Sequence, residues 1–431
     1  MVFQENFLHL VWKYQYFEKT QLTTTDQVPL EIKKIGYHNF HEGPDFFESH
    51  IQLDAVAYFG NVEIHLRSSD WNNHHHQHDE RYESVILHVV YEHDHEIFHP
   101  DGTRIPTLEL KGKIYLDVLR NYEKLLNGPN HILCSDSLPE TSTIIKFSML
   151  EKALVERFGQ KSKLITQLLE DNKGDWEETT YQWLFYSFGF KTNSAAMLEL
   201  AKCTPYRILK KHAPNVGIIE SILLGQADLL GTDIPDEYTS FLLKEYDFYA
   251  RKYRFDSGLY PSSWKFMGVR PGNFPTVRIA QVASILSNTP NLFSSIINPQ
   301  NDTTSIKQIF NYGISDYWRH HYRPGKMSKK VLGKTLSSQS IYLLSINFIV
   351  PLWYVYGQYV DDNTWQEKCF DLLQEMEAEQ NYIIKRFRQI QWHPENAYDS
   401  QGMIGLHNNY CLQKKCLECK IGQNLLRPVK K

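Results

Sequence analysis

The spacing of apolar residues changes character about one third of the way along the chain. Residues 3–17 carry an apolar stripe with helical spacing, and five short stretches with the composition of β-strands follow. The third and fourth stretches are separated by a polar segment, 68–83, which is long enough for a short helix. The predicted strands are 29–37, 46–53, 58–66, 85–91 and 107–110. The order of helix, three strands, helix and strand predicts an α/β sandwich.

Beyond residue 140 the apolar positions recur with helical spacing. Residues 146–172 are amphipathic, and Asp175 is placed to cap a following helix whose first turn holds Glu177 and Glu178. Further helices are predicted at 218–230, 239–253, 276–286, 305–312, 338–357 and 363–386. We therefore expect three parts: an α/β domain over 1–135, a mostly α-helical domain over 140–400 and a cysteine-containing C-terminal segment over 401–431.

Composition places the chain among globular proteins and shows where its chemistry is concentrated. Apolar residues make up 42% and charged residues 22%, and the net charge of −4 excludes a generally basic, nucleic-acid-coating surface. Residues 1–134 hold 11 Lys and Arg against 20 Asp and Glu, together with 14 of the 19 histidines. Acids and imidazoles are thus concentrated in the first third, where we expect the functional site.

The sequence also bears on membranes and compartment. The longest uncharged stretch, 335–360, is interrupted by several polar residues and by Pro351, which favours a buried helix over a membrane span. The first residues show neither the cationic region nor the apolar region of a secretory signal. Six scattered or C-terminally clustered cysteines suit a reducing compartment. We expect a cytoplasmic protein with no membrane segment.

The densest group of polar candidates lies on the second and third predicted strands. Asp45 follows Gly43 and Pro44 at the start of one strand, and Glu63 and His65 stand two residues apart on the next. Residues two apart on a strand face the same side, so two carboxylates and an imidazole are expected at one end of the sheet. Such a group would hold Mg²⁺ or Mn²⁺ with positions open for a phosphate and a water molecule.

Two other interpretations of this region stay open. Acidic residues at strand ends are often only solvated surface groups. Alternatively, His74 and His76 in the polar segment are metal ligands, and with His65 they would form the centre of a Zn²⁺-dependent hydrolase.

The element order and the two short motifs resemble the restriction-endonuclease-like PD-(D/E)xK nuclease superfamily. The resemblance implies that Asp45 and Glu63 bind the metal and that His65 stands where the family has the lysine that positions the attacking water. Glu5, on the first helix, corresponds to an acid that some members carry there. Neutral imidazole does not reproduce an ammonium group at neutral pH. This departure favours, as an alternative, an inactive descendant that binds nucleic acid or protein.

A second resemblance extends over nearly the whole chain. The chain is similar to an uncharacterised bacterial family, the domain of unknown function 2851, which implies that its parts form one unit but carries no activity with it. The residues that support this resemblance are the runs 43–46, 62–65, 69–71, 85–90 and 270–275 and the cysteine-rich end.

The C-terminal cysteines form a separate candidate metal site. Cys411, Cys416 and Cys419 have the spacing of soft-metal ligands, and His407 lies four residues before the first of them. Three thiolates with a fourth ligand would make a structural Zn²⁺ site or, with Cys134, an iron–sulfur cluster. The alternative is three ordinary thiols near the end of the chain. This end of the chain is similar to that of some iron–sulfur nucleases of the superfamily named above, which close their nuclease domain with a C-terminal cysteine cluster.

The helical part offers two candidates for binding a substrate phosphate. Arg270 opens the run Arg-Pro-Gly-Asn-Phe-Pro, and Arg278 follows on a predicted helix. A rigid turn that packs Phe274 explains the same run without a ligand. Together the observations predict a metal-dependent phosphodiesterase or nuclease that acts on nucleic acid, with Asp45, Glu63 and His65 in the catalytic roles.

Overall fold

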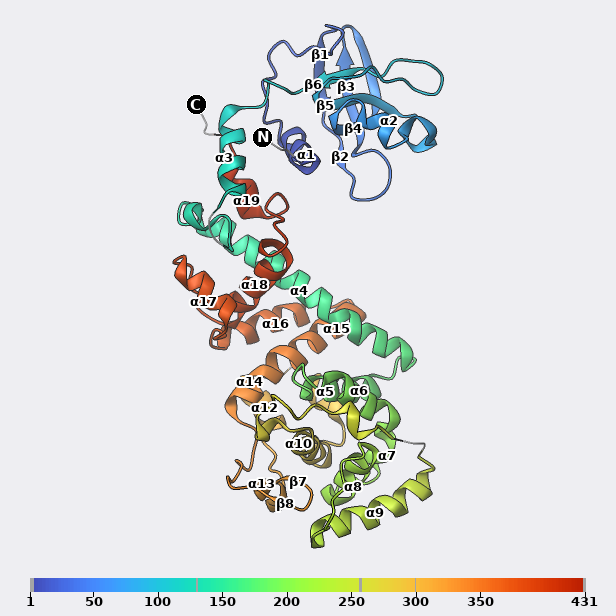
Figure 1. Ribbon diagram of the computed structural model, residues 1–431, viewed down its shortest axis with the longest axis vertical. Coiled ribbons are helices and arrows are strands. Elements are labelled where there is room, and N and C mark those ends of the chain that lie inside the picture. The colour runs from blue at the N-terminus through green and yellow to red at the C-terminus, as the bar shows by residue number, and fades with distance from the viewer. Residues whose placement is uncertain (1–3, 129–130, 256–257, 299, 429–431) are drawn as a thin grey trace. The chain divides into compact units, whose positions relative to one another are not determined.

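The protein, seen here in a computed structural model that describes residues 4–128, 131–255, 258–298 and 300–428, divides into two compact units (Figure 1). Unit 1 is drawn from both ends of the chain and comprises Met1–Ala153, Tyr382–His393 and Gly402–Lys431. Unit 2 comprises Leu154–Asn381 and Pro394–Gln401. The C-terminal cysteine-containing segment therefore belongs to the same unit as the N-terminal sheet.

Unit 1 contains a mixed sheet in which β3, β4, β5 and β6 follow predicted segments, whereas the predicted strand 29–37 is split into β1 and β2. The sheet order is β1-β3-β4-β5-β6, and β2 also pairs with β3. Strands β1, β3 and β4 are antiparallel neighbours, whereas β5 runs parallel to β4 and β6 parallel to β5. The bounds are β1 Leu30–Lys34, β2 Tyr37–His38, β3 Phe46–Leu53, β4 Val56–Arg67, β5 Val85–Glu92 and β6 Thr107–Glu109.

The first helix and the connection between β4 and β5 complete this layer. Helix α1 (Glu5–Tyr14) is confirmed, although Phe3, the first residue of its predicted stripe, lies outside the described residues. It buries Phe7, Val11 and Trp12. The segment predicted as a short helix contains α2 (Asp70–Asn73) and two 3₁₀ turns, His76–His78 and Glu80–Tyr82. A parallel pair requires such a crossover connection.

Burial along the strands explains where polar chemistry can collect. Strand β5 is buried through most of its length, as expected for a strand paired in parallel on both sides. Strand β4 is exposed over its first residues and becomes fully buried from Val62 to His65. Two ionisable side chains, Glu63 and His65, therefore lie in the most buried part of the sheet.

Helices from both ends of the chain complete unit 1. Its helical elements are α3 (Leu116–Leu126), the first part of α4 (Thr143–Asp171), α17 (Tyr382–Gln389), the end of α18 (Ala397–Leu406), the π-helical turn His407–Cys411 and α19 (Lys420–Leu425). Figure 1 shows α19, in red, beside α3, in cyan, and Asn121 Nδ2 donates to the Arg427 carbonyl over 3.4 Å. Leu426 packs into the same apolar core as Phe7 and Val118.

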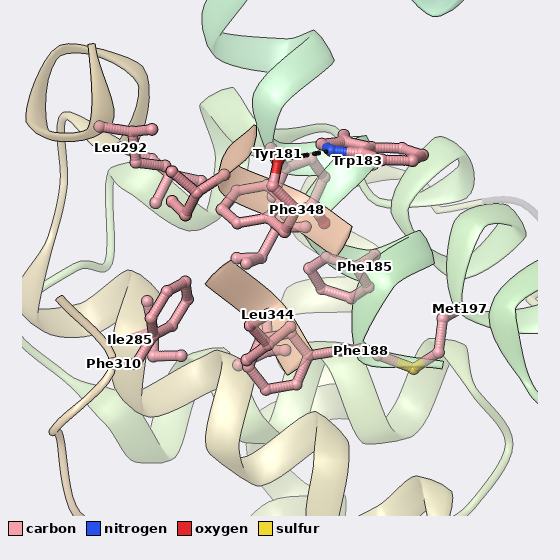
Figure 2. Packing of buried hydrophobic residues seen from close by; sticks show 14 of the residues in the cluster. Tyr181, Trp183, Phe185, Phe188, Met197, Ile285, Leu292, Phe310, Leu344 and Phe348 are labelled. Atoms are coloured by element: carbon pink, nitrogen blue, oxygen red, sulfur yellow. Dashed lines mark hydrogen bonds between the residues drawn. The ribbon is translucent and has the colours of Figure 1, made fainter. Parts of the chain in front are cut away.

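Unit 2 is almost entirely helical and has one large apolar core. Figure 2 shows Tyr181, Phe185 and Phe188 of α5 around Leu344 and Phe348, and Trp183 Nε1 donates to the Phe348 carbonyl over 3.0 Å. Asp175 caps α5 by accepting the Glu178 N–H, as predicted. The remaining helices of this unit are the rest of α4, α5 (Trp176–Phe188), α6 (Ser194–Cys203), α7 (Tyr206–Lys210), α8 (Val216–Gln226), α9 (Glu237–Tyr253), α10 (Pro275–Asn288), α11 (Leu292–Ile296), α12 (Thr303–Ile309), α13 (Asp316–His320), α14 (Ser338–Leu344), α15 (Val350–Val360) and α16 (Thr364–Glu375).

The long uncharged stretch lies inside this core. Among the described residues, Ser338–Val360 is the one helical stretch long and apolar enough to cross a membrane, and 78% of its most apolar part is buried. A π-helical turn, Ser345–Ile349, joins α14 to α15. The prediction of a buried helix is confirmed.

One predicted helix is interrupted. The segment 363–386 forms α16 and α17 because the chain becomes extended at Met376, where Glu377 pairs with Asn396. The Ala397 N–H donates to the Met376 carbonyl over 2.8 Å. This pairing partner is distant in sequence, so helical periodicity alone gives no sign of the break.

A buried carboxyl in unit 2 makes stability depend on pH. Glu220 of α8 is fully buried, and its Oε2 accepts from Tyr238 Oη at 2.6 Å and Trp318 Nε1 at 2.8 Å. Burial raises the pKa of Glu220 from 4.5 to about 7. Between these values the folded protein keeps a proton that the unfolded chain has lost, so the free energy of unfolding falls as pH rises from the lower to the higher value.

We expect Glu220→Gln to remove a decline of about 3 kcal/mol in unfolding free energy between pH 5 and pH 8. Urea unfolding at pH 5 and at pH 8 measures the free energy of unfolding of the variant and of the parent. Exposed Glu170→Gln is the matched control and should keep the parent's decline. An equally steep decline in Glu220→Gln would contradict the assignment.

Candidate metal-binding site

The site is built on the buried half of β4. Glu63 and His65 alternate with apolar residues, so their side chains emerge on the same face of the sheet. Glu63 pairs in register with His88 of β5, which brings a third ionisable group to this part of the sheet. All three residues are buried. Burial of such groups is costly unless they are paired, so their partners identify the site.

Imidazole nitrogens lie in direct contact around His65. Its Nδ1 lies 2.8 Å from His88 Nε2, and its Nε2 lies 3.1 Å from His74 Nδ1. Glu63 Oε1 lies 3.4 Å from His76 Nε2 and 3.6 Å from His65 Nε2. In the part of the chain that the structure describes, one group of three or more His, Cys, Asp or Glu side chains has ligand atoms all within 4.8 Å of one another, and it is His65, His74 and His76.

The β4–β5 connection brings two of these histidines to the sheet. His75 adopts a left-handed conformation (φ 62°) between α2 and the first 3₁₀ turn, and this reverses the chain between His74 and His76. The His76 ring stacks on Tyr82 at 3.8 Å between centroids and meets the edge of Trp71 at 5.4 Å. These two buried aromatic residues therefore hold the orientation of His76 toward Glu63.

Asp45 joins the site through hydrogen bonds to β4. Its Oδ2 accepts the Ile64 N–H at 2.9 Å, and its own N–H donates to Glu63 Oε2 at 3.1 Å. The reciprocal bonds hold the two predicted carboxylates together where β3 begins. From α1, His9 Nε2 approaches Asp45 Oδ2 to 3.2 Å and Glu5 Oε1 to 3.9 Å. Glu5 thus lies beside the predicted site as well.

Burial keeps three of the imidazoles, those of His65, His76 and His88, neutral. Burial, followed by the charge of Asp45, raises the pKa of Glu63 far above its usual value. Burial and the neighbouring imidazole of His88 lower the pKa of His65. Burial also lowers the pKa of His76 to about 4 and that of His88 to about 3. Neutral imidazole is the form that binds metal ions, so His65 and His76 are ready for coordination near neutral pH.

The residues present fit a metal ion. Within the described residues, the buried His76 Nε2 has no hydrogen-bond partner, since its 3.4 Å approach to Glu63 lacks hydrogen-bond geometry. Coordination would satisfy this atom. The contact from His65 to His88 resembles the outer hydrogen bond that commonly orients a metal-binding histidine.

The two predicted phosphate-binding arginines lie in unit 2. Arg278 is buried, and its guanidinium donates to Gln281 at 2.8 Å and Asn273 at 2.6 Å while lying over the Phe190 ring. The N–H donors of its guanidinium group are therefore used in hydrogen bonds inside unit 2. Arg270 is exposed at the start of a 3₁₀ turn.

Sequence reasoning missed His9, His88 and Tyr82. A usable signal existed for His9, because Glu5 and His9 are four residues apart and share one face of α1. His88 also offered a signal, because it is a lone polar residue in an apolar strand. No sequence pattern pointed to Tyr82 as a residue of the site.

Comparison with known proteins gives a family. A family model described as protein of unknown function (DUF2851) matches residues 5–382. No curated protein and no solved structure matches the chain. The chemical interpretation of the site therefore depends on its geometry.

We expect the histidine site to bind Mn²⁺ and His76→Ala to weaken this binding by at least about 10-fold, because a ligand is lost. Mn²⁺ is the suitable probe because thiolates prefer softer ions. Calorimetric titration measures the affinity. Exposed His78→Ala, two residues away, is the control and should bind as the parent does. Equal affinities of His76→Ala and the parent would place the ion elsewhere.

Proposed function

The chain belongs to the DUF2851 family, and from the geometry of unit 1 we propose that it is a metal-dependent phosphodiesterase that acts on nucleic acid. The observation that carries the proposal is the meeting of Asp45, Glu63 and three histidines at one place in the sheet. A hydrolytic metal centre needs this combination of ligands and nearby proton acceptors.

Glu63, His65, His74 and His76 are the residues that would hold the ion. Three imidazoles with one carboxylate favour Mn²⁺ or Zn²⁺ over Mg²⁺, which prefers oxygen ligands. Such an ion, when bound, neutralises charge on a phosphate and makes water more acidic.

The proposed role of the α1 side chains is to move a proton. His9 Nε2 lies between Asp45 Oδ2 and Glu5 Oε1, and within the described residues it makes no hydrogen bond. An imidazole flanked by two carboxylates is placed to take a proton from an attacking water and hold it. Asp45, fixed by the Ile64 N–H, orients the ring.

The arrangement of elements supports nucleic acid as the substrate class. The order of α1, three antiparallel strands, α2 and a parallel strand resembles the restriction-endonuclease-like core. Asp45 directly precedes β3 and Glu63 lies on β4, where that family has its carboxylates. His65 takes the position of the family's lysine, but it is buried and in contact with two histidines, so the water-activating role passes to His9.

A cleft beside His9 suits a nucleic-acid strand. It has a volume of about 500 Å³, and its lining includes Lys13, Lys152, His38 and Phe40. Lysines attract phosphates, and exposed aromatic rings stack on bases. Phe40 is 78% exposed, which leaves its ring available for such stacking.

Two other functions remain as competing hypotheses. The three-histidine group equally favours a Zn²⁺-dependent hydrolase of small esters. The absence of a lysine at position 65 favours an inactive protein that binds nucleic acid or protein.

Cleavage of nucleic acid tests the proposal. Single- and double-stranded DNA and RNA are incubated with the protein and Mn²⁺, Zn²⁺, Mg²⁺ or EDTA. We expect cleavage with Mn²⁺ or Zn²⁺ that falls by at least about 100-fold in Glu63→Gln. Exposed Glu83→Gln is the control and should cleave normally.

The other outcomes discriminate among the hypotheses. Hydrolysis of small esters without nucleic-acid cleavage would replace the nuclease by the Zn²⁺ hydrolase. Binding of nucleic acid or protein without any turnover would favour the inactive module. Cleavage that Glu63→Gln retains would show a contaminant or another site.

The proton-transfer role of His9 predicts a separable defect. We expect His9→Gln to lower kcat by about 100-fold or more while the affinity for Mn²⁺ stays unchanged, because His9 is not among the ligands. Single-turnover cleavage and Mn²⁺ titration of the same preparation measure both quantities. A joint loss of metal affinity and rate would show that His9 supports the ligands instead.

A further inference from the structure

Four of the six cysteines converge on one cavity in unit 1. Cys134, Cys411, Cys416 and Cys419 line it together with Leu125, Leu133, Tyr410 and Gly422. Cys134 follows α3, whereas the other three belong to the end of the chain, so folding alone brings them together. All six cysteines are free thiols, and the remaining two, Cys203 and Cys369, lie in unit 2.

The surroundings of these thiols make a cation the natural partner. Four sulfur atoms share a mainly apolar cavity, where isolated polar groups are not compensated for their loss of hydration. Soft cations bind such groups as thiolates and compensate for their burial.

The spacing of the sulfur atoms favours one of the two candidate cofactors. A single Zn²⁺ with Zn–S bonds of about 2.3 Å places its thiolates about 3.8 Å apart. No three cysteine sulfurs among the described residues lie within 4.8 Å of one another, since the histidine group is the one set that meets this condition. An iron–sulfur cluster inserts its own iron and sulfide atoms between the thiolates and therefore needs a wider frame.

We propose that Cys134, Cys411, Cys416 and Cys419 ligate an iron–sulfur cluster. His407, the other candidate for the fourth ligand, is engaged by Arg386 at 3.2 Å and Asn408 at 3.0 Å. Cys134 takes its place. The proposal is independent of the activity assigned to the sheet site.

Backbone groups around Cys419 suit a charged sulfur. The Ile421 and Gly422 N–H groups lie near its thiol without forming a cap hydrogen bond to it. Such donors commonly surround cluster sulfurs and tune them. A Cβ at position 422 would lie 2.1 Å from the Cys416 carbonyl oxygen, so only glycine allows this close turn. Lys152 adds a nearby positive charge.

The cluster would fasten the end of the chain to the N-terminal core. Cys416 and Leu417 pack against the apolar core that contains the sheet, and Leu426 is part of it. Cys419 and Ile421 belong to a second core with Met149 of α4. Ligation of Cys134 would join both sides at one point, which is the effect of a structural metal site.

Metal analysis of the full chain tests the proposal. The protein is purified without oxygen, and iron, acid-labile sulfide and zinc are measured per chain. We expect iron and sulfide in similar amounts, visible absorbance that dithionite bleaches, and an electron paramagnetic resonance signal in the reduced protein or the oxidised one. Zinc in place of iron, or neither metal after reconstitution with Fe²⁺ and sulfide, would overturn the proposal.

Variants locate the cluster. In Cys134→Ala we expect the amount of iron bound per chain to fall by at least about 10-fold, because a ligand is removed. Cys203→Ala is the matched control, because Cys203 is a half-buried thiol of unit 2, and it should keep its iron. Iron retained in full by Cys134→Ala would contradict the ligand set. Should Cys134→Ala fail to fold, the spectra of the parent decide the question, because they need no variant.

Discussion

The structure of unit 1 depends on the burial of several ionisable side chains in the middle of an apolar sheet. Glu63, His65 and His88 all lie where β4 and β5 are most buried. Burial of such groups without partners costs several kcal/mol each, so the fold must supply partners. It does so with His74 and His76 from the β4–β5 connection and with Asp45 from the start of β3.

This requirement explains local features that otherwise look arbitrary. The left-handed His75 turns the chain so that His74 and His76 both face the sheet. Tyr82 and Trp71 pack around the His76 ring. The connection forms α2 and two 3₁₀ turns rather than one continuous helix. Function, under our proposal, is the reason that a sheet retains so costly an interior.

The second organising feature is the return of the chain's end to its beginning. Unit 1 uses residues separated by more than half of the chain, and its apolar core includes both Phe7 and Leu426. The four cysteines lie at this junction. A long-range closure of this kind is entropically costly, and a cofactor that bound only the folded state would stabilise it.

The sequence by itself determined most of the strands and many of the helices, and it pointed to Asp45, Glu63 and His65. Strand-like composition located the strands of the sheet, although the predicted strand 29–37 is split into β1 and β2, and the two-residue spacing placed Glu63 and His65 on one face. These features are local, because side-chain direction along a strand follows from the chain's own period. The tertiary structure alone decided which groups meet: His9 with Asp45, His88 with His65, and Cys134 with the C-terminal cysteines. It also broke the helix predicted at 363–386. Contacts between residues far apart depend on packing and pairing across the fold, which no local pattern of one sequence records.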